Sequence, residues 1–291
     1  MMTKIITDST AYIPERLKKE YDIEVISLSV AFEDQVFKEN NISNDTFYKK
    51  LDASHTIPTS SQPSIDEFYK IFEEKVKADH PVVGVFISSE MSGTYTTANL
   101  VKKMILENYP NAKIEIIDSR SNCMQLGYAA IAGAKLAKDG KSIGEVVEAV
   151  KENIKRSRFI FIPDTLKYLK KGGRIGSAKA LLGSMLQIKP ILTVMDGKTH
   201  MLRKVRTKKK ALKEMIDLFL EDIRDHGLGE VMVHHIHCEE EAIKFANSLS
   251  EKVGESIGIA SIGPVIGTHV GPGSLGIVYY TQKELREVMF E

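Results

Sequence analysis

Three segments rich in hydroxyl side chains and glycine are where this chain could bind a ligand. They cover residues 59–64, 88–95 and 267–274 and read TSSQPS, SSEMSGTY and GTHVGPGS. The second lies between an apolar run and a helical pattern, and a strand-to-helix turn of this kind leaves backbone N–H groups free to bind an anion. Each segment alone could be only a helix cap or a turn. Three of them in one chain favour an anion site.

The anion is not expected to be a nucleotide. The sequence contains no G-x-x-x-x-G-K-[ST] loop, and no G-x-G-x-x-G follows a predicted strand. Ser92 and His269 could act as the nucleophile and base of a serine hydrolase, although no acid that would orient the histidine stands out. A serine hydrolase built on these two residues is therefore the alternative hypothesis for the function.

A metal site is a second possibility, because residues 234–238 read HHIHC and imidazole and thiolate are zinc ligands. On a strand, His235 and His237 would share one face, with Cys238 beyond them. No second cluster of ligands accompanies them, and histidines at a strand end account for the pattern without a metal. We therefore predict neither a metal nor a cofactor.

Basic residues are frequent between residues 167 and 210. Nucleic acid is not predicted to bind there, because Tyr168 is the one aromatic residue among them and the net charge of the chain is only +1. Two arginines are placed differently from the rest: Arg174 follows a glycine pair and Arg206 ends a predicted strand. Arginine in such positions often binds phosphate or an acidic partner surface.

The elements that position these residues alternate between short apolar runs and helical patterns in the first half of the chain. Strands are predicted at residues 4–7, 23–32, 82–87 and 113–117, and helices at 15–21, 65–79, 94–109, 127–138 and 142–156. Ser64 with Glu67 and Ser142 with Glu145 form capping boxes at two of the helix starts. This alternation with apolar strands predicts a three-layer α/β domain with a parallel sheet.

The pattern changes near residue 158, after which strands and helices follow one another without a β-α-β rhythm. Strands are predicted at residues 159–163, 190–195, 200–206, 230–235, 256–261 and 275–280, and helices at 164–171, 177–186, 208–226 and 239–252. Asp196-Gly197 predicts a hairpin turn. We expect a two-layer α+β domain here, and we divide the chain into domains at residues 1–161 and 162–291.

The composition is that of an ordinary globular protein, with 43% hydrophobic and 27% charged residues among 291. Two cysteines form no disulfide framework and fit a reducing compartment. The start of the chain lacks the apolar core of a secretion signal, and no run of about 18 apolar residues would span a bilayer. The protein is predicted to be cytoplasmic, without integral membrane association, and we favour a monomer.

Five short motifs, in order along nearly the whole chain, resemble the DegV family. They are ITDST at residues 6–10, SSQPS at 60–64, SGTY at 92–95, KGGRI at 171–175 and GTHVGPG at 267–273. The resemblance implies a fatty-acid-binding protein. The best understood members act as the binding subunit of a bacterial fatty acid kinase, in which a separate ATP-binding subunit phosphorylates the carboxyl group of the bound acid.

The resemblance also implies a role for particular residues. The carboxyl group would be bound by Ser60, Ser92 and His269. Ser60 stands where the family has threonine and keeps the hydroxyl, and Thr268 stands where alanine or serine is common. The supporting loops would contribute Ser61, Gly93, Thr94, Thr268 and Gly271. Arg174 and Arg206 match arginines suited to contact the kinase subunit or its phosphates.

We therefore predict a non-catalytic lipid-binding protein of fatty acid metabolism or transport. It would bind one long-chain fatty acid such as palmitate or oleate, with the carboxyl at the domain interface, and present it to the kinase subunit. Burying about 15 methylenes at roughly 0.8 kcal/mol each offers at most about 12 kcal/mol. Residues that could form the cavity wall, or equally plain core, are Leu181, Leu182, Met185, Leu186 and Ile188.

Overall fold

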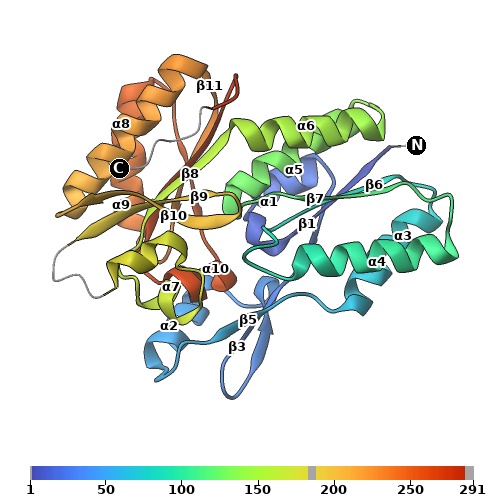
Figure 1. Ribbon diagram of the computed structural model, residues 1–291, viewed down its shortest axis with the longest axis horizontal. Coiled ribbons are helices and arrows are strands. Elements are labelled where there is room, and N and C mark those ends of the chain that lie inside the picture. Colours follow the sequence, from blue (N-terminus) through green and yellow to red (C-terminus); the bar gives the residue numbers. More distant parts are fainter. Residues whose placement is uncertain (1, 183–187, 286–291) are drawn as a thin grey trace.

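The computed structural model describes residues 2–182 and 188–285, which form three β-sheets and the helices that cover them (Figure 1). The first sheet, sheet A, has the strand order β2-β1-β6-β7, and all its neighbouring strands are parallel. Its strands are β1 (Lys4–Asp8), β2 (Ile23–Ile26), β6 (Val82–Phe86) and β7 (Ile114–Asp118). The apolar runs of the first half of the chain therefore form the predicted parallel sheet.

Helices cover both faces of sheet A, as the three-layer prediction requires. They are α3 (Ile65–Lys77) and α4 (Thr94–Asn108) on one face and α5 (Cys123–Lys138) and α6 (Ile143–Arg156) on the other. Successive residues of β1 point to opposite faces, so Ile6 packs in the core with Phe68 and Val101, whereas Ile5 packs with Ala130 and Val150. Both predicted capping boxes are present at the starts of α3 and α6.

A small antiparallel sheet, sheet B, lies beside sheet A and has the strand order β4-β3-β5. Its strands are β3 (Ser29–Ala31), β4 (Val36–Lys38) and β5 (Thr59–Ser61). The single strand predicted at residues 23–32 is therefore wrong, because β2 ends at Ile26 and β3 belongs to another sheet. The apolar run continues across the break because Ile26 and Leu28 are both buried, but in different core clusters.

Short elements complete this half of the chain. The helices α1 (Glu15–Glu20) and α2 (Asn44–Ala53) pack around sheets A and B, and 3-10 turns form at Ser9–Ala11 and Glu39–Asn41. The sequence patterns did not reveal α2. It buries only three of its side chains, those of Phe47, Tyr48 and Leu51.

The largest sheet, sheet C, has the strand order β10-β9-β8-β13-β11-β12, with only β11 and β12 parallel. Its strands are β8 (Ser157–Ile162), β9 (Lys189–Met195), β10 (Lys198–Val205), β11 (Leu228–His235), β12 (Gly258–Ser261) and β13 (Leu275–Thr281). The predicted hairpin joins β9 to β10, with Asp196 and Gly197 at φ 49° and 78°. Positive φ at both residues is the geometry of a type I′ turn.

Two long helices, α8 (Lys208–His226) and α9 (Glu239–Val253), cover one face of sheet C. The strand β8 is buried along its whole length: Ile160 and Ile162 pack under α8 and α9, and Phe159 and Phe161 point to the opposite face. The predicted division at residues 161 and 162 stays a prediction. Residue 161 lies within β8, which pairs with β9 and β13 on its two sides.

Three predicted elements of the second half differ from the structure. The helix α7 is limited to Lys167–Lys171, and a 3-10 helix at Gly176–Leu181 replaces the first part of the helix predicted at residues 177–186. Residues 183–186 of that prediction lie outside the described part of the chain. The segment at 267–274, predicted as a loop, begins inside a helix, α10 (Pro264–Val270). Its glycine, threonine and histidine suggested a turn, but burial of residues 264–268 and a proline at the helix start favour the helix.

Candidate functional site

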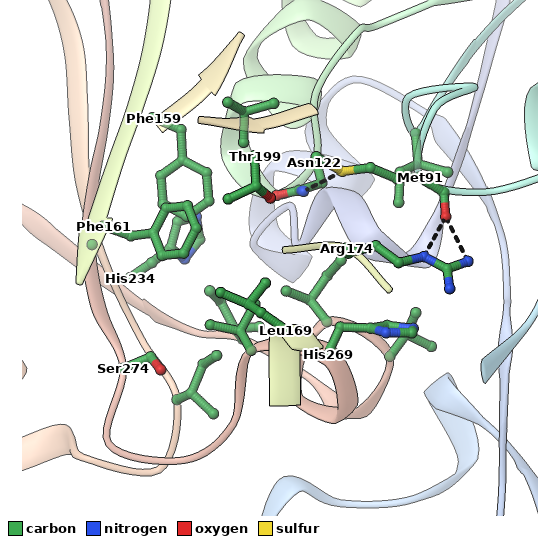
Figure 2. A pocket seen from close by; sticks show the side chains of 18 of the residues that line it. Met91, Asn122, Phe159, Phe161, Leu169, Arg174, Thr199, His234, His269 and Ser274 are labelled. Atoms are coloured by element: carbon green, nitrogen blue, oxygen red, sulfur yellow. Dashed lines mark hydrogen bonds between the residues drawn. The ribbon is translucent and has the colours of Figure 1, made fainter. Parts of the chain in front are cut away.

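A narrow apolar cavity lies between sheet C, α10 and the turns that follow β6 and β7 (Figure 2). Its apolar lining residues are Leu28, Ile87, Met91, Phe159, Phe161, Leu169, Val194, Ile236, Ile262, Val265, Ile266, Val270 and Leu275. In Figure 2, Arg174 and His269 lie on one side of it, and Phe159, Phe161 and His234 on the other. Ser60 and Ser92 also line the cavity. The hydroxyl segments of the sequence therefore meet at a mainly apolar cavity.

The closest polar contact in the cavity joins Ser60 to His269. Ser60 Oγ lies 2.7 Å from His269 Nε2, although 209 residues separate the two in the chain. The strand β5 directs Ser60 inward, while its neighbour Ser61 is exposed. His269 stands in the last turn of α10. Sheet B and α10 thus place a hydroxyl and an imidazole at one point.

The imidazole of His269 is kept neutral by its surroundings. Burial lowers the pKa of His269 to about 4, and the positive charge of Arg174 contributes in the same direction. Its Nδ1 is buried and has no hydrogen-bond partner among the described residues. A Cβ atom at Gly172 would lie 2.2 Å from this nitrogen, so the first glycine of the KGGR motif leaves room for the ring.

Arg174 connects the KGGR segment, residues 171–174, by hydrogen bonds to the turn before α4. Its Nε and Nη2 donate to the carbonyl oxygen of Met91 at 3.1 and 2.9 Å, and its Nη1 donates to the carbonyl oxygen of Gly172. Figure 2 shows this fork beside His269. The guanidinium therefore supplies a positive charge at the edge of the cavity.

The turn that carries Ser92 packs directly against the segment that carries Ser60. A Cβ atom at Gly93 would lie 2.0 Å from Gln62 Oε1, and Gln62 Nε2 donates to Thr97 Oγ1 of α4 at 2.5 Å. Ser92 Oγ lies 2.8 Å from Thr94 Oγ1. Because a glycine at residue 93 permits this approach, both serines border one cavity.

The remaining residues named from the sequence do not line the cavity. Thr94 and Thr268 are buried, and the hydroxyl of Thr268 has no hydrogen-bond partner among the described residues. Gly271 has φ 89°, and a Cβ atom there would lie 2.2 Å from the ring of Tyr168 in α7. Arg206 is exposed. The structure thus brings together Ser60, Ser92, His269 and Arg174, and leaves Arg206 apart from them.

Of the residues that the sequence offered as cavity wall or plain core, those that the structure describes do not line this cavity. Leu181 is buried outside the cavity, and Leu182 and Ile188 are 36% and 37% exposed. Met185 and Leu186 lie outside the described residues. The wall comes instead from strands of sheet C and from α10.

Sequence patterns missed two residues that hold α10 in place. Glu39 Oε1 accepts hydrogen bonds from Tyr12 Oη and from the N–H of Val265, both at 2.8 Å, and Tyr12 Oη accepts one from the N–H of Ile266 at 3.2 Å. These two N–H groups belong to the first turn of α10, where a helix lacks its own acceptors. Burial raises the pKa of Glu39 to about 6. No sequence motif around Glu39 indicates that it accepts a hydrogen bond from the start of α10.

The alternative chemistries find little support in the geometry. The described residues contain no group of three side chains able to hold a metal ion. His235 and Cys238 border a separate surface cleft, and His237 stacks on Tyr48 with ring centres 4.9 Å apart. His234 lines the main cavity, but its Nδ1 lies 3.1 Å from the carbonyl oxygen of Ala260 and its Nε2 accepts from the N–H of Met124 at 3.2 Å.

A serine hydrolase is likewise not favoured. His269 contacts Ser60 rather than Ser92, and no described carboxylate bonds to its Nδ1 as a triad requires. A G-x-S-x-G pattern, which in α/β-hydrolases carries the nucleophilic serine, does occur at residues 140–144. Its Ser142 caps α6, accepting the N–H of Glu145 at 3.3 Å and donating to that side chain at 2.8 Å.

Within residues 2–182 and 188–285, none of the helices combines the length and the apolar composition that a membrane span requires.

Comparisons with known proteins agree over almost the full length of the chain. A family model described as "Uncharacterised protein, DegV family" matches residues 2–282. A DegV domain-containing protein of Clostridium acetobutylicum is 53% identical over 286 residues, covering 98% of this chain and 100% of that protein.

Solved structures give the same result. The crystal structure of DegV, a fatty acid binding protein from Bacillus subtilis, matches with a TM-score of 0.86 and 34% identity, covering 97% of this chain and 99% of that one. The fatty acid binding DegV family protein of Streptococcus agalactiae matches with a TM-score of 0.87 and 28% identity, over 97% and 99% of the two chains.

Proposed function

Because this chain belongs to the DegV family, we propose that it binds one long-chain fatty acid such as palmitate or oleate. The carboxylate would lie at Ser60, Ser92 and His269, and the acyl chain would fill the apolar cavity. Two of its structural relatives, from Bacillus subtilis and Streptococcus agalactiae, are described as fatty acid binding proteins. The protein would have no catalytic activity of its own and would need no cofactor.

The observation that carries the proposal is the Ser60–His269 pair at a cavity whose remaining walls are largely apolar. The hydroxyls of Ser60 and Ser92 are neutral donors that can bind a carboxylate without a full ion pair. Arg174, at the same place, supplies a positive charge that favours the ionised acid. The acyl chain would supply most of the affinity, and the polar groups would fix its direction.

The expected partner is a separate kinase subunit that phosphorylates the exposed carboxyl oxygen to an acyl phosphate. Ser60 and Ser92 would position one carboxylate oxygen, and the other would remain available to the phosphoryl donor. Arg174 and Arg206 are both exposed, as residues that contact such a subunit or its phosphates must be. Because Arg174 also borders the cavity, it would take part both in binding the carboxylate and in contacting the kinase subunit.

Native mass spectrometry of the purified protein tests the binding directly. We expect a mass surplus equal to one C16 or C18 acid, released on denaturation and identified by lipid extraction. The double variant Ser60→Ala with Ser92→Ala should lose most of this load, whereas Ser61→Ala, an exposed neighbour on the same strand, should keep it. A protein that carries no lipid and takes up neither palmitate nor oleate would refute the proposal.

Acyl phosphate formation with an added fatty acid kinase subunit tests the partner. Arg206→Ala should lower the rate of phosphorylation while leaving the affinity for the fatty acid unchanged, because Arg206 does not line the cavity. Lys204→Ala, at an exposed position on β10 nearby, is the matched control. Equal rates for all three proteins would remove Arg206 from the proposed contact.

A further inference from the structure

We propose that Asn122 makes the cavity selective for fatty acids that carry a hydroxyl group along the acyl chain. The proposal rests on the function proposed above and concerns the class of acid that the same cavity prefers. It starts from the position of Asn122, which precedes α5, is 7% exposed and lines the cavity.

The amide of Asn122 has an unmet hydrogen-bonding capacity. Its Nδ2 donates to the thioether sulfur of Met91 at 3.1 Å, which Figure 2 shows as a dashed line. A thioether is a weak acceptor. Its Oδ1 is buried and has no hydrogen-bond partner among the described residues. If the amide were turned over, the NH₂ group would take the place without a partner, so either orientation leaves one end of the amide unsatisfied.

His234 and Ser274, which also line the cavity, have hydrogen-bond partners. The two ring nitrogens of His234 contact the backbone at Ala260 and Met124. Ser274 Oγ donates to the carbonyl oxygen of Gly271 at 2.8 Å. Among the described residues that line the cavity, Asn122 and His269 each have a buried polar atom without a hydrogen-bond partner. Because His269 is assigned to the carboxylate, Asn122 remains to bind a polar group elsewhere on the ligand.

A saturated acyl chain would cover this amide without bonding to it, which leaves its desolvation uncompensated. A hydroxyl on the chain is both a donor and an acceptor, so it can satisfy the amide in either orientation. A site built to bond a polar group discriminates strongly against the analogue that lacks it. We expect a preference of about tenfold for the hydroxylated acid, the usual effect of one buried hydrogen bond.

The test compares stearic acid with stearic acids hydroxylated near the middle of the chain, at carbon 10 or carbon 12. Dissociation constants are measured for the wild type, Asn122→Leu and Ser274→Ala. At least one hydroxystearate should bind the wild type about tenfold more tightly than stearate. Asn122→Leu should reverse that order. Ser274→Ala, which removes a lining hydroxyl that already has a partner, should leave the ratio unchanged.

Wild-type protein alone also gives an answer, should the leucine variant fail to fold. Native mass spectrometry of wild type with an equimolar mixture of the acids should show the hydroxystearate bound in excess. Stearate bound in equal or greater amount than both hydroxystearates would overturn the proposal, as would an unchanged ratio in Asn122→Leu. If no long-chain acid binds at all, the proposed function fails; if stearate binds without the preference, only the role of Asn122 fails.

Discussion

At the scale of single residues, the site combines an imidazole held neutral with hydroxyls and one guanidinium. His269 loses basicity because it is buried and because Arg174 lies nearby. An anion bound beside the ring would act in the opposite direction, since a negative charge stabilises the imidazolium. The charge state of His269 should therefore report whether the proposed carboxylate site is filled.

The first prediction is that ligand binding raises the pKa of His269 from about 4 toward its ordinary value of 6.5. Between the free and bound pKa values the complex holds a proton that the free protein lacks, so affinity should rise as pH falls through that window. NMR titration of the labelled imidazole, with palmitate and without it, measures both pKa values. His269→Gln assigns the resonance, and equal pKa values in the two states would contradict the prediction.

The second prediction concerns the two glycines before Arg174. Gly172 has an ordinary φ of −77°, so Gly172→Ala strains no backbone, but its Cβ would displace the His269 ring. We expect a loss of about 1–3 kcal/mol in stability from overpacking and an affinity for palmitate about tenfold lower.

Gly173→Ala is the control for that change. Gly173 has φ 72° with open space around its Cβ position, so alanine there should cost about 1–2 kcal/mol of backbone strain and leave affinity unchanged. Calorimetric binding curves and thermal unfolding separate the two effects. Equal affinities for the two variants would show that His269 does not depend on Gly172.

At the scale of elements, the short helix α10 carries His269 and is held at its start by residues from the other half of the chain. Glu39 and Tyr12 satisfy the N–H groups of Val265 and Ile266. A negative group at a helix start is favourable, yet burial opposes its ionisation. Here burial dominates, and the pKa of Glu39 is raised to about 6.

The third prediction follows from that raised pKa. Between pH 4.5, where an unfolded glutamate ionises, and about pH 6, the folded chain keeps a proton that the unfolded chain has lost. The stability that Glu39 contributes should therefore fall by about 2 kcal/mol as pH rises through this window. Urea unfolding of the wild type and Glu39→Gln from pH 4 to pH 7 measures it. Parallel stability curves for the two proteins would show that Glu39 has an ordinary pKa.

Several elements could be predicted from the sequence because their signals are local. The helix at residues 208–226, the hairpin at Asp196-Gly197 and both capping boxes depend on neighbours in the chain, and all are confirmed. The cavity wall could not be predicted in this way. In β8 every residue is buried, so no alternation marks Phe159 and Phe161 as the face toward the cavity. The role of Glu39 could not be predicted because the helix start that it holds, at Val265, lies more than 200 residues away in the chain.

The way in which the site residues come together also depends on distant parts of the chain. Ser60, Ser92 and His269 were named through a family resemblance, and the structure places all three around one cavity. Their roles in binding a carboxylate remain predictions. The composition of the hydroxyl segments indicated an anion site, but it carried no information about which segments meet. That depends on the packing of β5 against α10, which joins distant parts of the chain.

At the scale of the whole molecule, one hydrophobic core cluster joins the two larger sheets. It contains Ile5 and Val83 of sheet A together with Phe159 and Val278 of sheet C. Lys135 of α5 also pairs with Glu230 of β11 at 3.0 Å, although this exposed pair contributes little by itself. The shared core, rather than ion pairs, should hold the two predicted domains together.

The fourth prediction is that the chain unfolds in a single cooperative transition. A shared core means that neither half can lose its packing without exposing apolar surface of the other. Differential scanning calorimetry should give one peak whose calorimetric enthalpy equals its van't Hoff enthalpy. Two resolved transitions would show that the segments 1–161 and 162–291 fold independently, as the proposed domain division allows.

The cavity has a consequence for the lifetime of the protein in the cell. Its walls come from residues as far apart as Leu28 and Gly276, so an acyl chain inside it would complete a core that the polypeptide leaves partly unfilled. A ligand that binds only the folded state lowers the population of protease-sensitive open forms. Turnover of the protein would then slow when lipid is plentiful and quicken under starvation, so its abundance would follow lipid supply without any change in transcription.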